Sequence, residues 1–99
     1  MAENPMKIFE TLDPELLEAV ENGRKLAFGD GALPRKYKYL IALALDASSG
    51  ATEGVTSLAR AAMNAGATKE EIAETLRVTQ FISGAGSVYT SGRGLSDLF

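Results

Sequence analysis

The chain has 99 residues, of which 45% are hydrophobic and 23% charged, a composition typical of a globular domain with one core. Its net charge of −3 argues against a nucleic-acid-binding surface, which needs an excess of basic side chains. The sequence contains no cysteine and no histidine. Thiolate catalysis, disulfide cycling and histidine-based metal or acid–base chemistry are therefore excluded for these residues.

Neither a targeting signal nor a membrane span is predicted. The first residues, Met1 to Pro5, lack the positive charge and the apolar stretch of a secretion signal. The longest unbroken apolar run, Leu40 to Leu45, is far shorter than the ~20 residues needed to cross a bilayer. We expect a cytoplasmic protein with one domain over residues 1–99 that binds neither membranes nor nucleic acids.

The first predicted helix runs from Pro14 to about Phe28. Asp13 is a suitable N-cap residue, and proline is common at the first helical position. Gly29-Asp30-Gly31 marks the end of the helix. Gly23 weakens this helix because glycine lowers helix propensity.

A second helix is predicted from Pro34 to the Ser48-Ser49-Gly50 segment. The lysines and tyrosines near its start alternate as in a strand, but the length and alanine content of the segment favour a helix. Its second half, from Leu40 onwards, is apolar on nearly all sides. We therefore expect this helix to lie at the centre of the core.

Two more helices are predicted, over Ala51–Ala65 and from Thr68 to about Ile82. The first has one apolar stripe and is followed by Gly66, a typical left-handed stop. The second begins with the capping box Thr68-Lys69-Glu70-Glu71, in which the threonine and glutamate side chains each accept a hydrogen bond from the other residue's backbone N–H.

The C-terminal part is rich in small residues. The segment Ser83 to Ser87 either lets another helix approach closely or interrupts the helix. Ser91 to Phe99 contains too much glycine for a helix to be predicted, although its final apolar residues need cover, so we expect it to dock onto a neighbour. Four helices make a thin core, and oligomerisation would supply the missing burial.

The segment from Leu33 to Thr68 resembles the carboxymuconolactone decarboxylase family, which includes the alkylhydroperoxidase D-like proteins. The resemblance rests on Leu33-Pro34-Arg35 leading into Leu40 to Ala44, and on the run from Ala59 to Ile72. It extends more loosely to Tyr89. The resemblance implies an all-α fold, an alkylhydroperoxidase D-like helical bundle, in a subunit of a homo-oligomer that is usually a trimer or hexamer.

Redox members of this family carry a glutamate, a Cys-x-x-Cys pair and a histidine. The glutamate position falls on Tyr39 of this chain, and the cysteine positions fall on Ala51 and Gly54. The histidine position, which the decarboxylase members keep, falls on Leu58. All four functional residues are therefore replaced, and the resemblance implies the fold without either activity.

Glu53 and Tyr39 are the candidate catalytic residues. In a closed pocket the Glu53 carboxyl could act as an acid or base, but a first-turn carboxylate is also simply favoured by the helix dipole. Tyr39 could donate a hydrogen bond to a ligand or be an ordinary core residue. Arg60 could bind a carboxylate, lie solvated on its helix, or pair with Glu53.

Two charged clusters carry weaker hypotheses. Three glutamates near the start of the last predicted helix suggest a magnesium or calcium site, but the capping box already explains two of them. Three basic residues near the start of the second helix could bind an anion, but we expect a solvated helix face. The clusters are Glu70, Glu71 and Glu74, and Arg35, Lys36 and Lys38. We expect no metal and no cofactor.

The sequence thus predicts a carboxymuconolactone decarboxylase-like homo-oligomer without redox residues, which binds a small molecule in a pocket between helices, and an acidic molecule is one candidate. The predicted lining is Tyr39, Ala51, Gly54, Thr56, Leu58 and Arg60. One alternative is a structural or regulatory subunit that pairs with a catalytically complete relative. Another is a lyase or decarboxylase that uses Glu53 or Tyr39 as its proton donor.

Overall fold

The computed structural model describes residues 4–99, so residues 1–3 of the segment assessed for a secretion signal lie outside it. All secondary structure in the described part is helical, which confirms the predicted all-α class. The elements are η1 (Pro5–Ile8), α1 (Phe9–Leu12), α2 (Pro14–Phe28), α3 (Arg35–Ser48), α4 (Thr52–Asn64), α5 (Lys69–Ser83) and α6 (Gly86–Leu95). None of the helices within residues 4–99 has the length and hydropathy of a membrane span.

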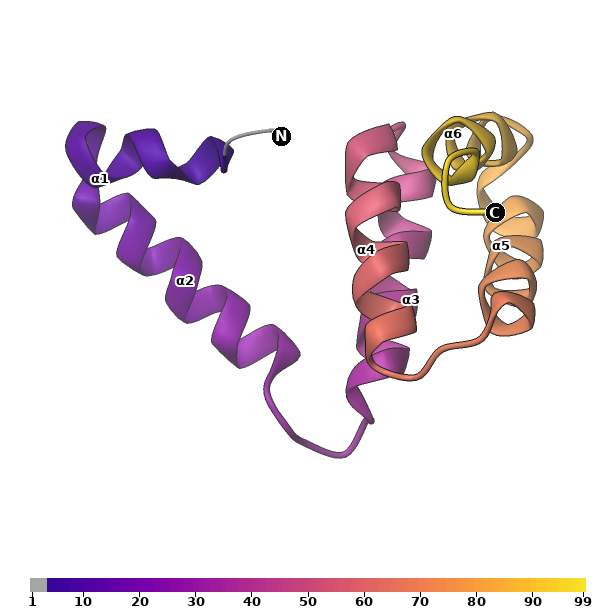
Figure 1. Cartoon of the computed structure of the whole chain (residues 1–99), viewed down its shortest axis with the longest axis horizontal. Helices are drawn as coiled ribbons and strands as arrows, with labels where there is room; N and C mark the ends of the chain where they lie inside the picture. Colours follow the sequence, from indigo (N-terminus) through magenta and orange to yellow (C-terminus); the bar gives the residue numbers. More distant parts are fainter. Residues whose placement is uncertain (1–3) are drawn as a thin grey trace.

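Helices α3 to α6 form a bundle around one core (Figure 1). Helix α3 contacts α4, α5 and α6, and α6 also contacts α4 and α5. Small alanines and a few larger side chains fill the core: Leu40, Leu43, Ala59, Ala62, Ala67 and Ile72. Small residues let the helix axes approach closely, so the core is thin, as the sequence predicts.

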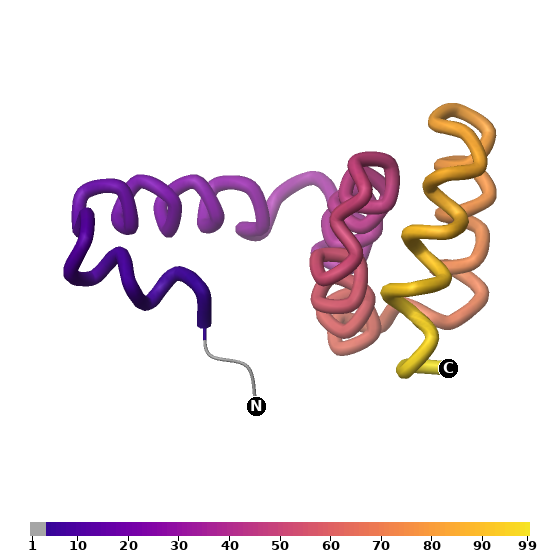
Figure 2. The backbone as a smooth tube through the Cα atoms, turned by 90° about the horizontal axis from the view of Figure 1, so that it is seen from above, coloured from indigo at the N-terminus to yellow at the C-terminus, as the bar shows by residue number. Residues whose placement is uncertain are grey.

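The first two helices form an N-terminal arm, residues 5–28, that extends away from the bundle. No residue of α1 or α2 is buried. Figures 1 and 2 give two perpendicular views, and in both the α3–α4 pair lies between the arm and α5. The arm therefore leaves the bundle on the side opposite α5.

Three contacts fix the direction of the arm at its junction with α3. The ring of Phe28 stacks on that of Tyr39, with 4.9 Å between the ring centroids. Lys38 Nζ donates a hydrogen bond to the carbonyl of Gly29 at 2.6 Å, and Arg35 Nε donates one to the carbonyl of Phe28 at 3.3 Å. Arg35 is exposed, in agreement with the predicted solvated helix face, whereas Lys38 is partly buried and binds a backbone carbonyl.

The helix boundaries predicted between Pro14 and Ser83 agree with the structure to within about a residue. Asp13 caps α2 by accepting a hydrogen bond from the Leu16 N–H at 3.1 Å. Both hydrogen bonds of the capping box at Thr68 are formed. Gly66 has φ +102°, the left-handed conformation expected of the glycine that stops the helix before the capping box.

The C-terminal segment departs from the prediction, because Gly86–Leu95 is the helix α6. Gly84, with φ +93°, ends α5 and separates it from α6. At Gly94, an added Cβ would lie 2.8 Å from the Thr52 carbonyl oxygen and 2.9 Å from Val55 Cγ1. Glycine at this point therefore permits the close packing of α6 on α4, and this packing outweighs its low helix propensity.

Helix α3 also departs from the prediction in part. Leu40, Leu43 and Ala47 are buried, as expected for a central helix. Ile41 and Leu45, however, are 50% and 64% exposed. One side of this helix therefore faces solvent in the single chain, although its apolar composition suits burial on all sides.

Candidate functional site

The residues predicted to line a pocket are held mainly by contacts within the bundle. Thr56 Oγ1 donates a hydrogen bond to the carbonyl of Gly94 at 2.6 Å, which ties α4 to α6. Leu58 packs against the core cluster, and so does Tyr39, whose ring also stacks on Phe28. These three positions contribute to the stability of the fold, and their binding roles stay predictions.

Asp46 of α3 adds a carboxylate to the start of α4. Ala51 is the N-cap residue of α4, and Gly54 follows in its first turn. An added Cβ at Gly54 would lie 2.8 Å from Asp46 Cγ. The candidate site predicted from the sequence did not include Asp46, although a lone carboxylate directly after the apolar run of α3 was the signal that could have drawn attention to it.

Glu53 and Arg60 are both exposed. The ion pairs found among residues 4–99 do not include a Glu53–Arg60 pair. The positions of these two side chains suit the simpler interpretation of each, a first-turn carboxylate and a solvated arginine on a helix face.

A different site is formed by an apolar groove between α3 and α5, which we call the α3–α5 groove. Its volume of about 690 Å³ lies within the range of small-molecule sites. The α3 wall is Tyr37, Leu40, Ile41, Ala44, Leu45 and Ser48, and the α5 wall is Glu71, Glu74, Thr75, Val78, Thr79, Ile82 and Ser83. None of the residues predicted to bind a ligand lines it.

Four hydroxyl groups in the α3–α5 groove donate their hydrogen to a backbone carbonyl one turn earlier. On α5, Thr75 donates to Glu71, Thr79 to Thr75, and Ser83 to Thr79, at 2.8 to 2.9 Å. On α3, Ser48 donates to Leu45 at 2.7 Å. A hydroxyl that has used its hydrogen offers only lone pairs. These groups can therefore accept hydrogen bonds from a ligand but not donate to it.

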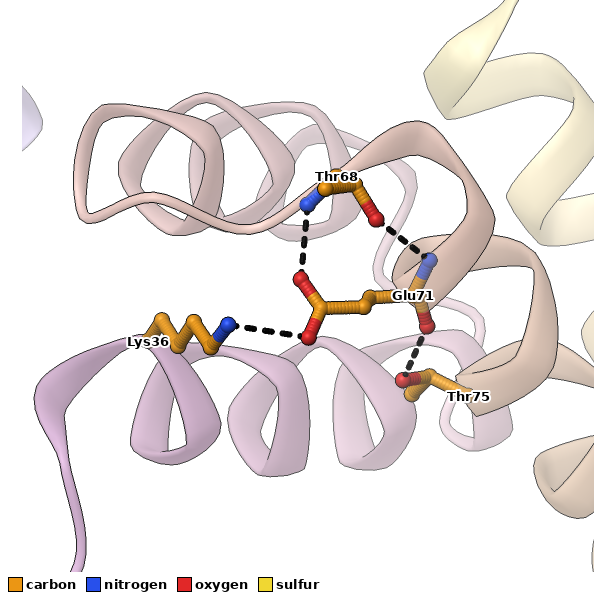
Figure 3. Close-up of polar contacts among 4 residues, drawn as sticks. All are labelled: Lys36, Thr68, Glu71 and Thr75. Atoms are coloured by element: carbon orange, nitrogen blue, oxygen red, sulfur yellow. Dashed lines mark hydrogen bonds and ion pairs between the residues drawn. The ribbon is translucent and has the colours of Figure 1, made fainter.

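Glu71, which lines one end of the groove, is the centre of a polar cluster (Figure 3). Glu71 Oε1 accepts a hydrogen bond from the Thr68 N–H at 2.8 Å, and Oε2 lies 2.9 Å from Lys36 Nζ. The hydrogen bond with Lys36 lowers the pKa of Glu71, and the same bond raises the pKa of Lys36. This cluster links the start of α5 to the start of α3.

The acidic residues near this end do not form a metal site in the structure. Within residues 4–99, no three acidic side chains lie close enough together to hold a metal ion. Glu71 is already engaged by Thr68 and Lys36. Glu74, one turn further along α5, is exposed at the edge of the groove.

Comparison with known proteins gives one consistent result. The sequence pattern of the carboxymuconolactone decarboxylase family matches residues 14–91. The structure is similar to the crystal structure of an apo carboxymuconolactone decarboxylase family protein from Legionella pneumophila, with a TM-score of 0.85 and 28% sequence identity. That similarity covers 92% of this chain and 81% of the other. No curated protein matches the sequence significantly.

Proposed function

Because the chain belongs to the carboxymuconolactone decarboxylase family, we propose that it is a homo-oligomeric, redox-inactive member that binds a small, largely apolar molecule in the α3–α5 groove. The α3–α5 groove supports this proposal most directly. It combines an apolar lining with a few polar groups, the usual make-up of a small-molecule site.

The polar groups of the groove favour a ligand that donates hydrogen bonds. Its two charged lining residues, Glu71 and Glu74, are both acidic, and four of its hydroxyl groups present only lone pairs. An apolar alcohol, phenol or amine complements these acceptors. A carboxylate would leave these acceptors unpaired and would lie near the exposed Glu74, with the Tyr37 hydroxyl as a donor in the lining, so the groove suits a hydrogen-bond donor better than an acidic ligand.

Binding of Nile red, a neutral fluorescent probe, tests this proposal. Ala44 lines the groove, and Ala73 is exposed on α5 outside it. We expect Ala44→Trp to weaken Nile red binding at least about tenfold by filling the groove, and the matched control Ala73→Trp to leave it unchanged. Benzylamine and benzyl alcohol should displace the probe better than benzoate. Equal binding by both variants, or preferential displacement by benzoate, would contradict the proposal.

The loss of redox chemistry follows from the residue types present. A thiol-dependent peroxidase of this family uses a cysteine pair, and these 99 residues contain no cysteine. We therefore expect no reduction of hydroperoxides with dithiol donors. A steady rate in metal-free, repurified protein would contradict this part of the proposal.

A lyase centred on the start of α4 is the second candidate, and the carboxylate of Asp46 beside Gly54 favours it. Asp46 and Glu53 would be the proton-transferring groups in such an enzyme. The regulatory-subunit alternative and the cytoplasmic location expected from the sequence stay predictions.

A further inference from the structure

The α3–α5 groove is open to solvent along its length. Ile41 and Leu45 on its α3 wall are 50% and 64% exposed, and Val78 and Ile82 on its α5 wall are 67% and 78% exposed. A small-molecule site normally buries most of the surface of its ligand. The groove of one chain is therefore an incomplete site that needs a cover.

Helix α2 carries a second uncovered apolar surface, which we call the α2 face. It consists of five exposed residues at helical spacing: Leu16, Ala19, Gly23, Leu26 and Ala27. Leu26 is 86% exposed, and nothing lies within 4 Å of an added Cβ at Gly23. An uncovered apolar face of this kind marks an interaction surface.

The α2 face matches the groove in length. Leu26 lies ten positions after Leu16 in the helix, a rise of about 15 Å, and the α3 wall from Tyr37 to Ser48 rises by about 16 Å. Between the two leucines, the small residues Ala19 and Gly23 do not extend into the groove. They would leave room for a ligand between α2 and the floor of the groove. The leucines would contact the groove at its two ends, and the small residues would roof the ligand space.

The arm cannot cover the groove of its own chain. In both views the α3–α4 pair stands between the arm and α5 (Figures 1 and 2). The stacking of Phe28 on Tyr39 and the bond from Lys38 to Gly29 hold α2 in this direction. A second copy of the chain carries the same uncovered α2 face and can supply the cover.

Charge sets the direction in which α2 lies on the groove. At one end of the groove the charge of Glu71 is balanced by Lys36, and the exposed carboxylate of Glu74 leaves that end acidic. Along the axis of α2, the basic residues Arg24 and Lys25 lie at the Leu26 end, on other sides of the helix than Leu26, and Glu15, Glu18 and Glu21 precede them. The basic end of α2 comes nearest to Glu74 when Leu26 lies over that end of the groove, and the acidic first turns of α2 then lie furthest from it.

We infer that α2 of a second copy lies along the α3–α5 groove, with Leu26 at the Glu74 end and Leu16 at the Ile82 end, and completes the binding site. The function of the enclosed space rests on the function proposed above. The contact between copies is tested without any ligand, so the proposed contact and the proposed small-molecule function can fail separately.

Cysteine crosslinking tests the contact, because the natural sequence has no thiol. A copy carrying Leu16→Cys is co-expressed with a size-tagged copy carrying Ile82→Cys, and a short bismaleimide is added. Both positions are exposed, so both variants should fold. The expected product links a tagged to an untagged chain.

The matched control replaces Leu16→Cys with Glu18→Cys, which lies about 200° away around α2. It should give at least about tenfold less linked product, because the thiols are not held close together. Leu26→Cys should pair with Ile82→Cys no better than this control. Equal linkage from Leu16→Cys and Glu18→Cys would overturn the contact, and stronger linkage from Leu26→Cys would overturn its direction.

Nile red binding by the unmodified protein separates the two proposals. Linked product without Nile red binding means that the contact between copies stands and the small-molecule function fails. Nile red binding without linked product means that the groove binds small molecules and the cover by α2 is wrong.

Discussion

Gly94 and Gly92 lie on the same helix but differ in their surroundings. A Cβ added at Gly94 would collide with the Thr52 carbonyl and Val55, whereas nothing lies within 4 Å of one added at Gly92. Alanine has a higher helix propensity than glycine. The same substitution should therefore change the stability of the fold in opposite directions at these two positions.

We expect Gly94→Ala to lower the free energy of unfolding by about 1–3 kcal/mol through overpacking. Gly92→Ala should raise it by up to about 1 kcal/mol. Urea unfolding followed by circular dichroism measures both. Equal effects of the two substitutions would mean that α6 does not pack on α4 as closely as the structure shows.

Tyr37 and Tyr39 show why the α3–α5 groove could not be located from the sequence. They are two residues apart on α3, so they lie about 200° apart around the helix and point to nearly opposite sides. Tyr39, chosen because it falls on a family position, stacks on Phe28 at the arm junction. Tyr37 lines the groove. Which side of α3 borders a groove depends on where α5 packs, and the sequence of α3 does not contain that information.

The start of α5 combines local and tertiary interactions on a single carboxylate. The bonds between Glu71 and Thr68 are local and were predicted from the capping box. The ion pair of Glu71 with Lys36 joins two helices that are distant in sequence and was not predicted. Figure 3 shows both oxygens of Glu71 engaged in this way.

The ion pair predicts a pH dependence of stability. Bonding to Lys36 lowers the pKa of Glu71 from its ordinary value of 4.5. Because the folded-state pKa lies below that of the unfolded chain, this carboxylate contributes stability above the ordinary value and loses that contribution as the pH falls through the folded-state pKa. The stability advantage of the wild type over Glu71→Gln should therefore shrink as the pH falls from neutral to below 4.5.

Urea midpoints of the two proteins across this pH range measure the effect. Glu74→Gln is the matched control, because Glu74 takes part in none of the ion pairs found among residues 4–99. A pH-independent difference between the wild type and Glu71→Gln would show that the ion pair does not form in solution.

At the scale of the whole molecule, more large apolar side chains are exposed than buried. Within residues 4–99, fourteen large hydrophobic residues are at least 43% exposed, whereas the buried ones larger than alanine are Leu40, Leu43, Val55 and Ile72. Exposure on this scale is typical of a subunit rather than of a monomer. The arm and the α3–α5 groove account for much of it.

Native mass spectrometry of gently purified protein should show a closed homo-oligomer, a trimer or hexamer by resemblance to the family. A constant extra mass on the assembly would identify a retained ligand of the groove. A bare monomer at micromolar concentration would contradict the proposed assembly and favour the alternative of a subunit that needs a different partner.

The sequence by itself determined the local structure: the all-α class, four helices with their boundaries, the capping box at Thr68 and the family. These features depend on interactions between residues a few positions apart, such as the bond between Thr68 and Glu71. The tertiary structure decided the helical state of Gly86–Leu95, the partner of Lys36 and the location of the groove. Each of these depends on which helix packs against which, and that choice is made by the shapes of surfaces brought together from distant parts of the chain.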